Sequence, residues 1–152
     1  MNRKTLTAIV LVWAGSALAG AWDTGSFDND DALDWVWELV ESKDLSIVSG
    51  PLRNAVNQSD YLEAPDASMA IAAAEVVAAL RGKPSHALPP EVSDWVQKNQ
   101  SEVGDDLAST AREAIERIKL IDSSELAQLW SESDELTAAW YASLANLQKR
   151  LE

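Results

Sequence analysis

The stretch that decides the fold is PDASMAIAAAEVVAAL, residues 65–80, which is apolar on nearly every side of a helix. Proline suits the first turn of a helix, and Asp66 in that turn lies at the positive end of the helix dipole. Arg81 and Gly82 follow as a basic last turn and a C-cap glycine. Because a helix without a polar face is a buried helix, we predict a central helix around which the other elements pack.

The length of this stretch argues against a membrane span. A helix over residues 65–80 extends about 24 Å, which is shorter than the roughly 30 Å of a bilayer's hydrocarbon core. Glu75 also interrupts it. If Glu75 is buried, it needs a partner such as Arg112, Arg117 or a tryptophan N–H. Otherwise it marks a solvent-facing edge or forms a structural ion pair.

Apolar residues at helical spacing predict further helices on both sides of the central one. The expected ranges are 29–43, 45–58, 91–100, 102–120, Asp122 to Trp130, and Ser133 to Leu151. We expect a bend near Gly50 in the second of these, a start nearer Asp105 in the fourth, and a cap from Asp122 and Glu125 on the fifth. We expect a break near residues 131–134. Since no segment alternates with the period of a strand, the predicted fold is all-α: a compact bundle of about six or seven helices around residues 64–80, preceded by a signal-peptide helix.

The N-terminus has the pattern of a secretory signal peptide. Arg3 and Lys4 precede an uncharged apolar segment, and Ala17-Leu18-Ala19 forms a small-residue cleavage site before Gly20. We predict cleavage after Ala19, a single domain over residues 20–152, and a periplasmic or secreted protein. An uncleaved membrane anchor is the alternative, because about 18 uncharged residues approach the minimum span.

Composition limits the possible partners and chemistry. The formal net charge is −13, and there is no cysteine. Thiol catalysis, thiolate metal sites and disulfides are thereby excluded. An acidic surface binds nucleic acid and anionic membranes poorly and favours a basic protein partner, divalent cations or simple solubility. We expect a monomer without a cofactor.

Acidic residues gather at the start of the predicted domain and are candidates for a metal site. They are Asp23, Asp28, Asp30, Asp31 and Asp34. Hard cations such as calcium take oxygen ligands from a short loop. However, Leu33 and Leu39 stand where a calcium loop needs glycine and glutamate. Helix capping, by Asp28 or Asn29, explains these residues equally well.

The remaining candidates are aromatic residues and a serine–histidine pair. Trp35, Trp95, Trp130 and Trp140 lie on apolar helical faces, so we expect them in the core, whereas Trp37 lies off the main stripe. Trp22 and Phe27 either pin the opening loop or contribute to a groove. Ser85 and His86 suggest a hydrolase, but adjacent residues seldom point together, and no Gly-x-Ser-x-Gly elbow or zinc motif occurs.

The opening of the predicted domain also carries a family resemblance. Gly-Ala-Trp-x-x-Gly-x-Phe-Asp-Asn-Asp-x-Ala-x-Asp-Trp, residues 20–35, resembles the signature of the bacterial family catalogued as domain of unknown function 4259. Residues 61–64, 72–82 and 124–130 resemble further parts of it. The motif residues singled out for interaction or structure are Trp22, Phe27, Asp28, Asn29, Asp30, Trp35 and Glu75. The resemblance implies no substrate and no catalytic residues.

These observations favour an exported helical module that is not an enzyme and that acts by protein contact, as an inhibitor or immunity-like partner of a basic protein. A divalent-cation binder using the aspartate cluster and a hydrolase of unknown class are the alternatives.

Overall fold

The computed structural model describes residues 25–100 and 103–152, and in this part of the chain the regular elements are helices. In chain order they are α1 (Asp30–Glu41), α2 (Ser46–Asn57), α3 (Ala64–Leu80), α4 (Pro90–Lys98), α5 (Asp105–Ile118), α6 (Glu125–Trp130) and α7 (Asp134–Arg150). An isolated parallel bridge joins Leu62 to Ser124, and the described residues form no strand. The all-α prediction is confirmed, whereas the expected signal helix lies outside the described residues.

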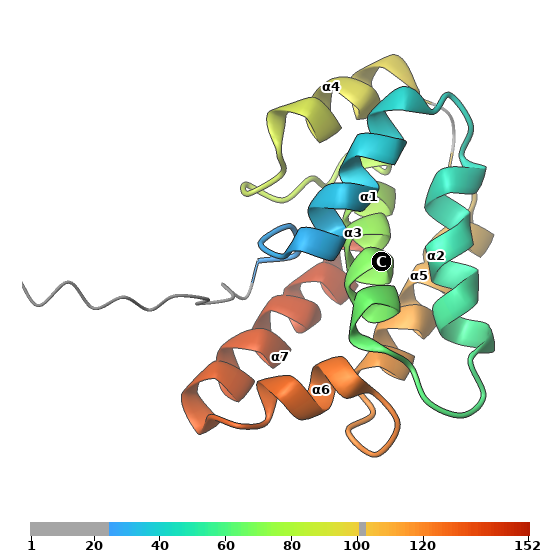
Figure 1. Ribbon diagram of the computed structural model, residues 1–152. Coiled ribbons are helices and arrows are strands. Elements are labelled where there is room, and N and C mark those ends of the chain that lie inside the picture. The colour runs from blue at the N-terminus through green and yellow to red at the C-terminus, as the bar shows by residue number, and fades with distance from the viewer. Residues whose placement is uncertain (1–24, 101–102) are drawn as a thin grey trace, which may run out of the picture.

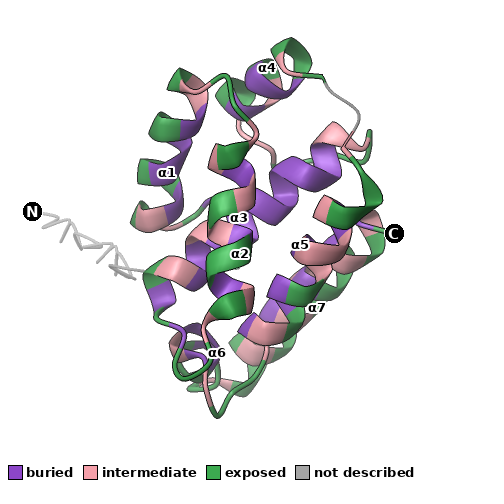
Figure 2. Ribbon diagram, turned by 90° about the vertical axis from the view of Figure 1, so that its right-hand side faces the viewer, coloured by how far each residue is buried: buried purple, intermediate pink, exposed green. Residues whose placement is uncertain are grey.

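Helix α3 is the centre of the fold. Every other helix of the described chain contacts it, and Figure 1 shows it running through the middle of the molecule. Each residue from Ala70 to Ala79 is buried, so its ribbon is purple over most of its length in Figure 2. Alanine side chains keep a helix narrow, so neighbouring helices can pack close to its axis. The predicted buried rod is therefore confirmed.

The start of α3 is held by the start of α6. The Glu125 carboxylate accepts a hydrogen bond from the backbone N–H of Ala64, with 2.7 Å between Oε2 and N. This places a negative charge at the positive end of α3. Ser124 is the N-cap of α6 and accepts from the N–H of Ala127. The prediction that Asp122 pairs with Glu125 to cap α6 was wrong, because Glu125 reaches across to α3.

The helix boundaries mostly follow the sequence pattern. Helix α5 begins at Asp105, as expected. The expected interruption of the helix occurs between Trp130, the end of α6, and Asp134, the start of α7. Helix α2 continues through Gly50 and Pro51. Within the described ranges, no helix combines the length and apolar character needed to cross a bilayer.

Three apolar residues that continue the helical spacing of the core positions are exposed. Ile121 is 46% exposed because it follows the end of α5, Leu129 is 43% exposed on the short α6, and Leu136 is 47% exposed near the start of α7. Helix α7 enters the core only from Trp140 onward, where Trp140, Leu144 and Leu147 are buried. Helical spacing therefore identified the right face of α7 but not how far the rest of the bundle covers it.

The packing around α3 predicts that a larger side chain there is costly. Ala74→Leu inserts three carbon atoms at a fully buried position and should lower the free energy of unfolding by about 1–3 kcal/mol. Chemical denaturation followed by tryptophan fluorescence measures this change. Ala139→Leu, at an exposed position of α7, is the matched control and should change stability by about 0.5 kcal/mol or less. Equal effects of the two substitutions would contradict close packing at α3.

Candidate functional site

The opening loop, residues 25–29, sets the direction of α1. Asn29 is the N-cap, and its Oδ1 accepts from the N–H of Ala32 at 2.9 Å. The Asp28 N–H donates to the Gly25 carbonyl, and the Asp28 carboxylate lies where a Cβ on Gly25 would be. Phe27 is buried in the core. The glycine, phenylalanine and asparagine of the opening motif thus shape this loop, and of the two predicted caps Asn29 is the one used.

The aspartates near the start of the domain are not gathered into a metal site in the described part of the chain. Asp30 and Asp31 lie in the first turn of α1, where they face the positive end of the helix dipole. Among the described residues, no group of three or more His, Cys, Asp or Glu side chains is placed to hold a metal ion. Asp28, Asp30, Asp31 and Asp34 therefore form no such ligand set, and Asp23 lies outside the described residues.

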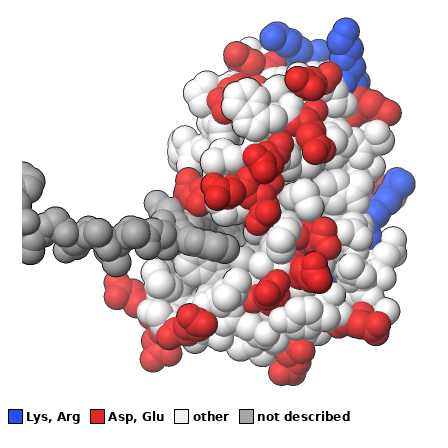
Figure 3. Space-filling model, viewed as in Figure 1, with Lys and Arg blue, Asp and Glu red and all other residues white. Residues whose placement is uncertain are grey.

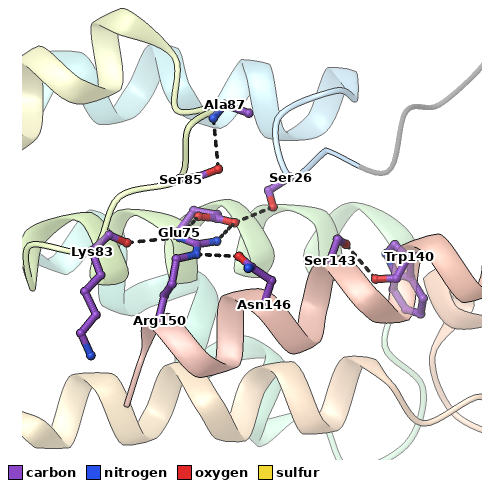
Figure 4. Close-up of polar contacts among 9 residues, drawn as sticks. All are labelled: Ser26, Glu75, Lys83, Ser85, Ala87, Trp140, Ser143, Asn146 and Arg150. Atoms are coloured by element: carbon purple, nitrogen blue, oxygen red, sulfur yellow. Dashed lines mark hydrogen bonds and ion pairs between the residues drawn. The ribbon is translucent and has the colours of Figure 1, made fainter.

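Glu75, in the middle of α3, is buried and paired with Arg150 in the last turn of α7 (Figure 4). Arg150 donates from Nη1 to Oε2 and from Nη2 to Oε1, both at 2.7 Å. The Ser26 hydroxyl donates to Oε1 at 3.0 Å. Arg150 also donates from Nε to Oδ1 of Asn146 and from Nη1 to the carbonyl of Lys83.

The partner of Glu75 differs from the ones that we expected. Arg112 donates to the carbonyl of Leu151, and Arg117 donates to the carbonyl of Gln58. Neither reaches Glu75, and the alternative of a structural ion pair holds instead, with Arg150. Both carboxylate oxygens of Glu75 accept a hydrogen bond from the Arg150 guanidinium, which forms a bidentate pair. The buried negative charge therefore has a counter-charge.

A surface cavity opens beside this ion pair, between the opening loop, the connection after α3 and the last turns of α7. Its volume is about 240 Å³. Glu75 and Arg150 belong to its lining, with Ser26, Asp28, Ser85 and Asn146 as further polar residues. Ser85 lies in this lining, but His86 is exposed and is not part of it. The serine and histidine considered for a hydrolase are therefore not presented together to the cavity.

A second feature is the outward side of α1, which we call the acidic face. It consists of the exposed residues Asp30, Leu33, Asp34, Trp37, Glu38 and Glu41. These positions recur three or four residues apart, so they form one stripe along the helix. Figure 3 shows carboxylates spread over this part of the surface. Trp37, the residue that lay off the buried stripe, is 72% exposed.

The other tryptophans of the described chain serve packing. Trp35, Trp95, Trp130 and Trp140 are all buried, as expected. Trp95 donates from Nε1 to the Ser42 carbonyl at 2.7 Å, which ties α4 to the end of α1. Trp130 and Trp140 stack with their ring centroids 6.2 Å apart. Trp22 lies outside the described residues. Trp37 is therefore the tryptophan of the described chain that is available for contact with another molecule.

The comparison with protein families shows to which family the chain belongs. The family model described as "Domain of unknown function (DUF4259)" matches residues 20–143. The chain belongs to this family. The DUF4259 match includes the opening loop, the acidic face and all of α3, but it ends before Asn146 and Arg150. Neither the curated proteins nor the solved structures gave a match.

The sequence analysis singled out Glu75 but missed Arg150, its partner beside the cavity. The available signal was weak: Arg150 lies four residues after Asn146 and three after the apolar position Leu147. A basic residue in the last turn of a helix already has an explanation in the helix dipole. Nothing local therefore distinguishes Arg150 as the counter-charge of a buried glutamate.

Removing one member of the ion pair should destabilise this DUF4259 protein strongly. Arg150→Met leaves the Glu75 carboxylate buried without its counter-charge, so we expect a loss of about 3 kcal/mol in the free energy of unfolding. The double variant Glu75→Met/Arg150→Met should recover much of that loss, since no unmatched charge remains. Lys149→Met, at the exposed neighbouring position, is the control. Glu75→Met alone completes the cycle, and denaturant titration of the wild type, the two single variants and the double variant measures the coupling. Additive effects of the two single substitutions would contradict it.

Proposed function

We propose that the protein is an exported binding module that is not an enzyme and that recognises a basic protein through the acidic face of α1, as an inhibitor or immunity-like partner would. The observation that carries this proposal is the exposure of Trp37, at 72%, among carboxylates. Leu33 lies one turn earlier and is 41% exposed. Tryptophan is the residue most enriched among the energetic centres of protein interfaces.

The charges on the acidic face beyond Asp30 support a role in contact, because they do not favour the helix itself. Asp30 and Asp34, and likewise Asp34 and Glu38, are like charges four residues apart, and each such pair costs about 0.2–0.5 kcal/mol. Glu38 and Glu41 lie near the negative end of the helix dipole, and α1 has no basic residue in its last turn. Local stability therefore accounts for Asp30 but not for Asp34, Glu38 and Glu41, whose repulsion a basic partner would relieve.

The chemistry of the face defines the partner. Carboxylates on the same stripe as an indole suit lysine or arginine side chains, which pair with the carboxylates and pack their alkyl stems or a guanidinium on the indole. The formal net charge of −13 adds long-range attraction for a basic protein. Such attraction raises the rate of association and makes binding weaken as salt rises.

Export is part of the proposal and rests on the leader alone. Arg3 and Lys4, the apolar segment after them and Ala17-Leu18-Ala19 form the pattern of a cleaved signal peptide. If export occurs, the intact mass of the protein from its producing cell corresponds to residues 20–152. A full-length mass in a membrane fraction would instead indicate a retained anchor.

The proposed contact face is tested by comparing variants that keep the bundle intact. Immobilised wild-type protein is exposed to periplasmic extract of the producing cell, and retained proteins are measured by quantitative mass spectrometry. We expect a basic protein whose binding falls about 30-fold with Trp37→Ala, since a central aromatic contributes about 2 kcal/mol or more. The neutralised double variant Asp34→Asn/Glu38→Gln should bind more slowly and with less dependence on salt.

The controls carry similar changes in and just before α7. Leu136→Ala removes an exposed apolar side chain of α7, and Glu132→Gln/Glu135→Gln removes two exposed charges near its start. Both should bind as the wild type does. The proposal fails if α1 variants and controls lose the partner equally, or if no protein is retained at moderate salt. If a partner is retained, crosslinking at Trp37 identifies which of the partner's residues lie against α1.

A further inference from the structure

The surface cavity beside Glu75 and Arg150 has the features of a small-ligand site, separate from the acidic face. At about 240 Å³ it has room for several water molecules or a small ligand. Four segments far apart in sequence build it, namely the opening loop, Glu75 of α3, the connection around Ser85, and α7 (Figure 4). The hydrogen bonds of Arg150 to Glu75, Asn146 and Lys83 fix its floor.

The charge at the floor selects against ionic ligands. Glu75 and Arg150 neutralise each other through two hydrogen bonds. A charged group brought against this pair would lose its hydration without gaining a counter-charge. Asp28, the other ionisable lining residue, is exposed at the rim, where water screens it. An anion is disfavoured further by the acidic protein as a whole.

The hydrogen-bonding groups of the lining require a ligand that both donates and accepts. Asn146 uses its Oδ1 for Arg150, and its amide N–H groups donate to no other described residue. The Ser85 hydroxyl accepts from the N–H of Ala87, which leaves its proton to donate. The Asp28 carboxylate is an acceptor at the rim. An apolar ligand would leave these groups without partners as it excluded water from them.

We propose that this cavity binds a small neutral polyol of about monosaccharide size. Hydroxyl groups donate to the carboxylate and accept from the serine hydroxyl and the amide N–H groups, so they match both halves of the lining. Phe27 and Ala87 supply an apolar wall for the C–H side of such a molecule. A ligand of roughly a dozen heavy atoms in a shallow site binds with a dissociation constant in the millimolar range.

The test is ligand binding by the purified protein, followed by NMR. Glucose, myo-inositol and glycerol are the polyol probes, while putrescine and glutamate are charged probes of similar size. We expect saturable binding of at least one polyol, with shifts in the backbone amides of residues 25–28, 85–87 and 143–146, and no saturable binding of the charged probes there. The proposal is overturned if only a charged probe binds, or if no polyol binds at concentrations up to about 100 mM.

Two variants locate the site. Ala87→Phe fills the cavity from an exposed position of its wall and should weaken polyol binding at least tenfold. Asn146→Asp keeps an oxygen for Arg150 but removes the N–H donors, and should weaken binding about tenfold, the loss expected for one good hydrogen bond. Ala139→Leu, on the exposed part of α7, should leave binding unchanged. Unchanged affinity in folded Ala87→Phe and Asn146→Asp would place the polyol elsewhere and overturn the assignment.

Discussion

The structure depends on one constraint, which is that every other helix of the described chain must reach the same narrow rod. Helix α3 can serve all of them only because its side chains are small over most of its length. Larger side chains would increase the helix separation and open voids between the neighbours, since interiors are packed as densely as organic crystals. The alanines thus contribute less through their own apolar area than through the packing of larger residues such as Leu39, Leu52 and Ile115 around them.

Glu75 is the exception in this rod, and it explains much of the surrounding arrangement. A carboxylate at 4% exposure has to be matched, and the matching draws in Ser26, Arg150 and, through Arg150, Asn146. An ion pair of this kind adds little net stability compared with an apolar pair, because two charges lose their hydration. Its clearer effect is geometric: it fixes where the opening loop and the end of α7 lie, and so shapes the cavity between them. The acidic face of α1 lies outside this network, on the side of the helix that points to solvent.

The sequence was sufficient to predict most of the helices, but not the contacts between residues far apart in the chain. Periodicity placed α1, α3, α4 and α5 and the break before α7, because each depends on residues within one or two turns. The partner of Glu75 could not be found in this way, since the five arginines of the described chain are chemically equivalent and only the fold decides which one reaches Glu75. The exposure of Leu129 and Leu136 is a similar case, because coverage depends on the lengths of neighbouring helices. For Trp37 the pattern left burial and exposure open, and the position of α1 on the bundle decides for exposure.

The pairing across 75 positions of sequence between Glu75 and Arg150 has a consequence for how the chain can assemble. The central helix contains a carboxylate whose counter-charge is supplied by α7, the last of the described helices in chain order. As long as α7 is undocked, the middle of α3 either stays hydrated or buries an unmatched charge. Docking of α7, and not formation of the alanine-rich helix alone, therefore completes the burial of α3.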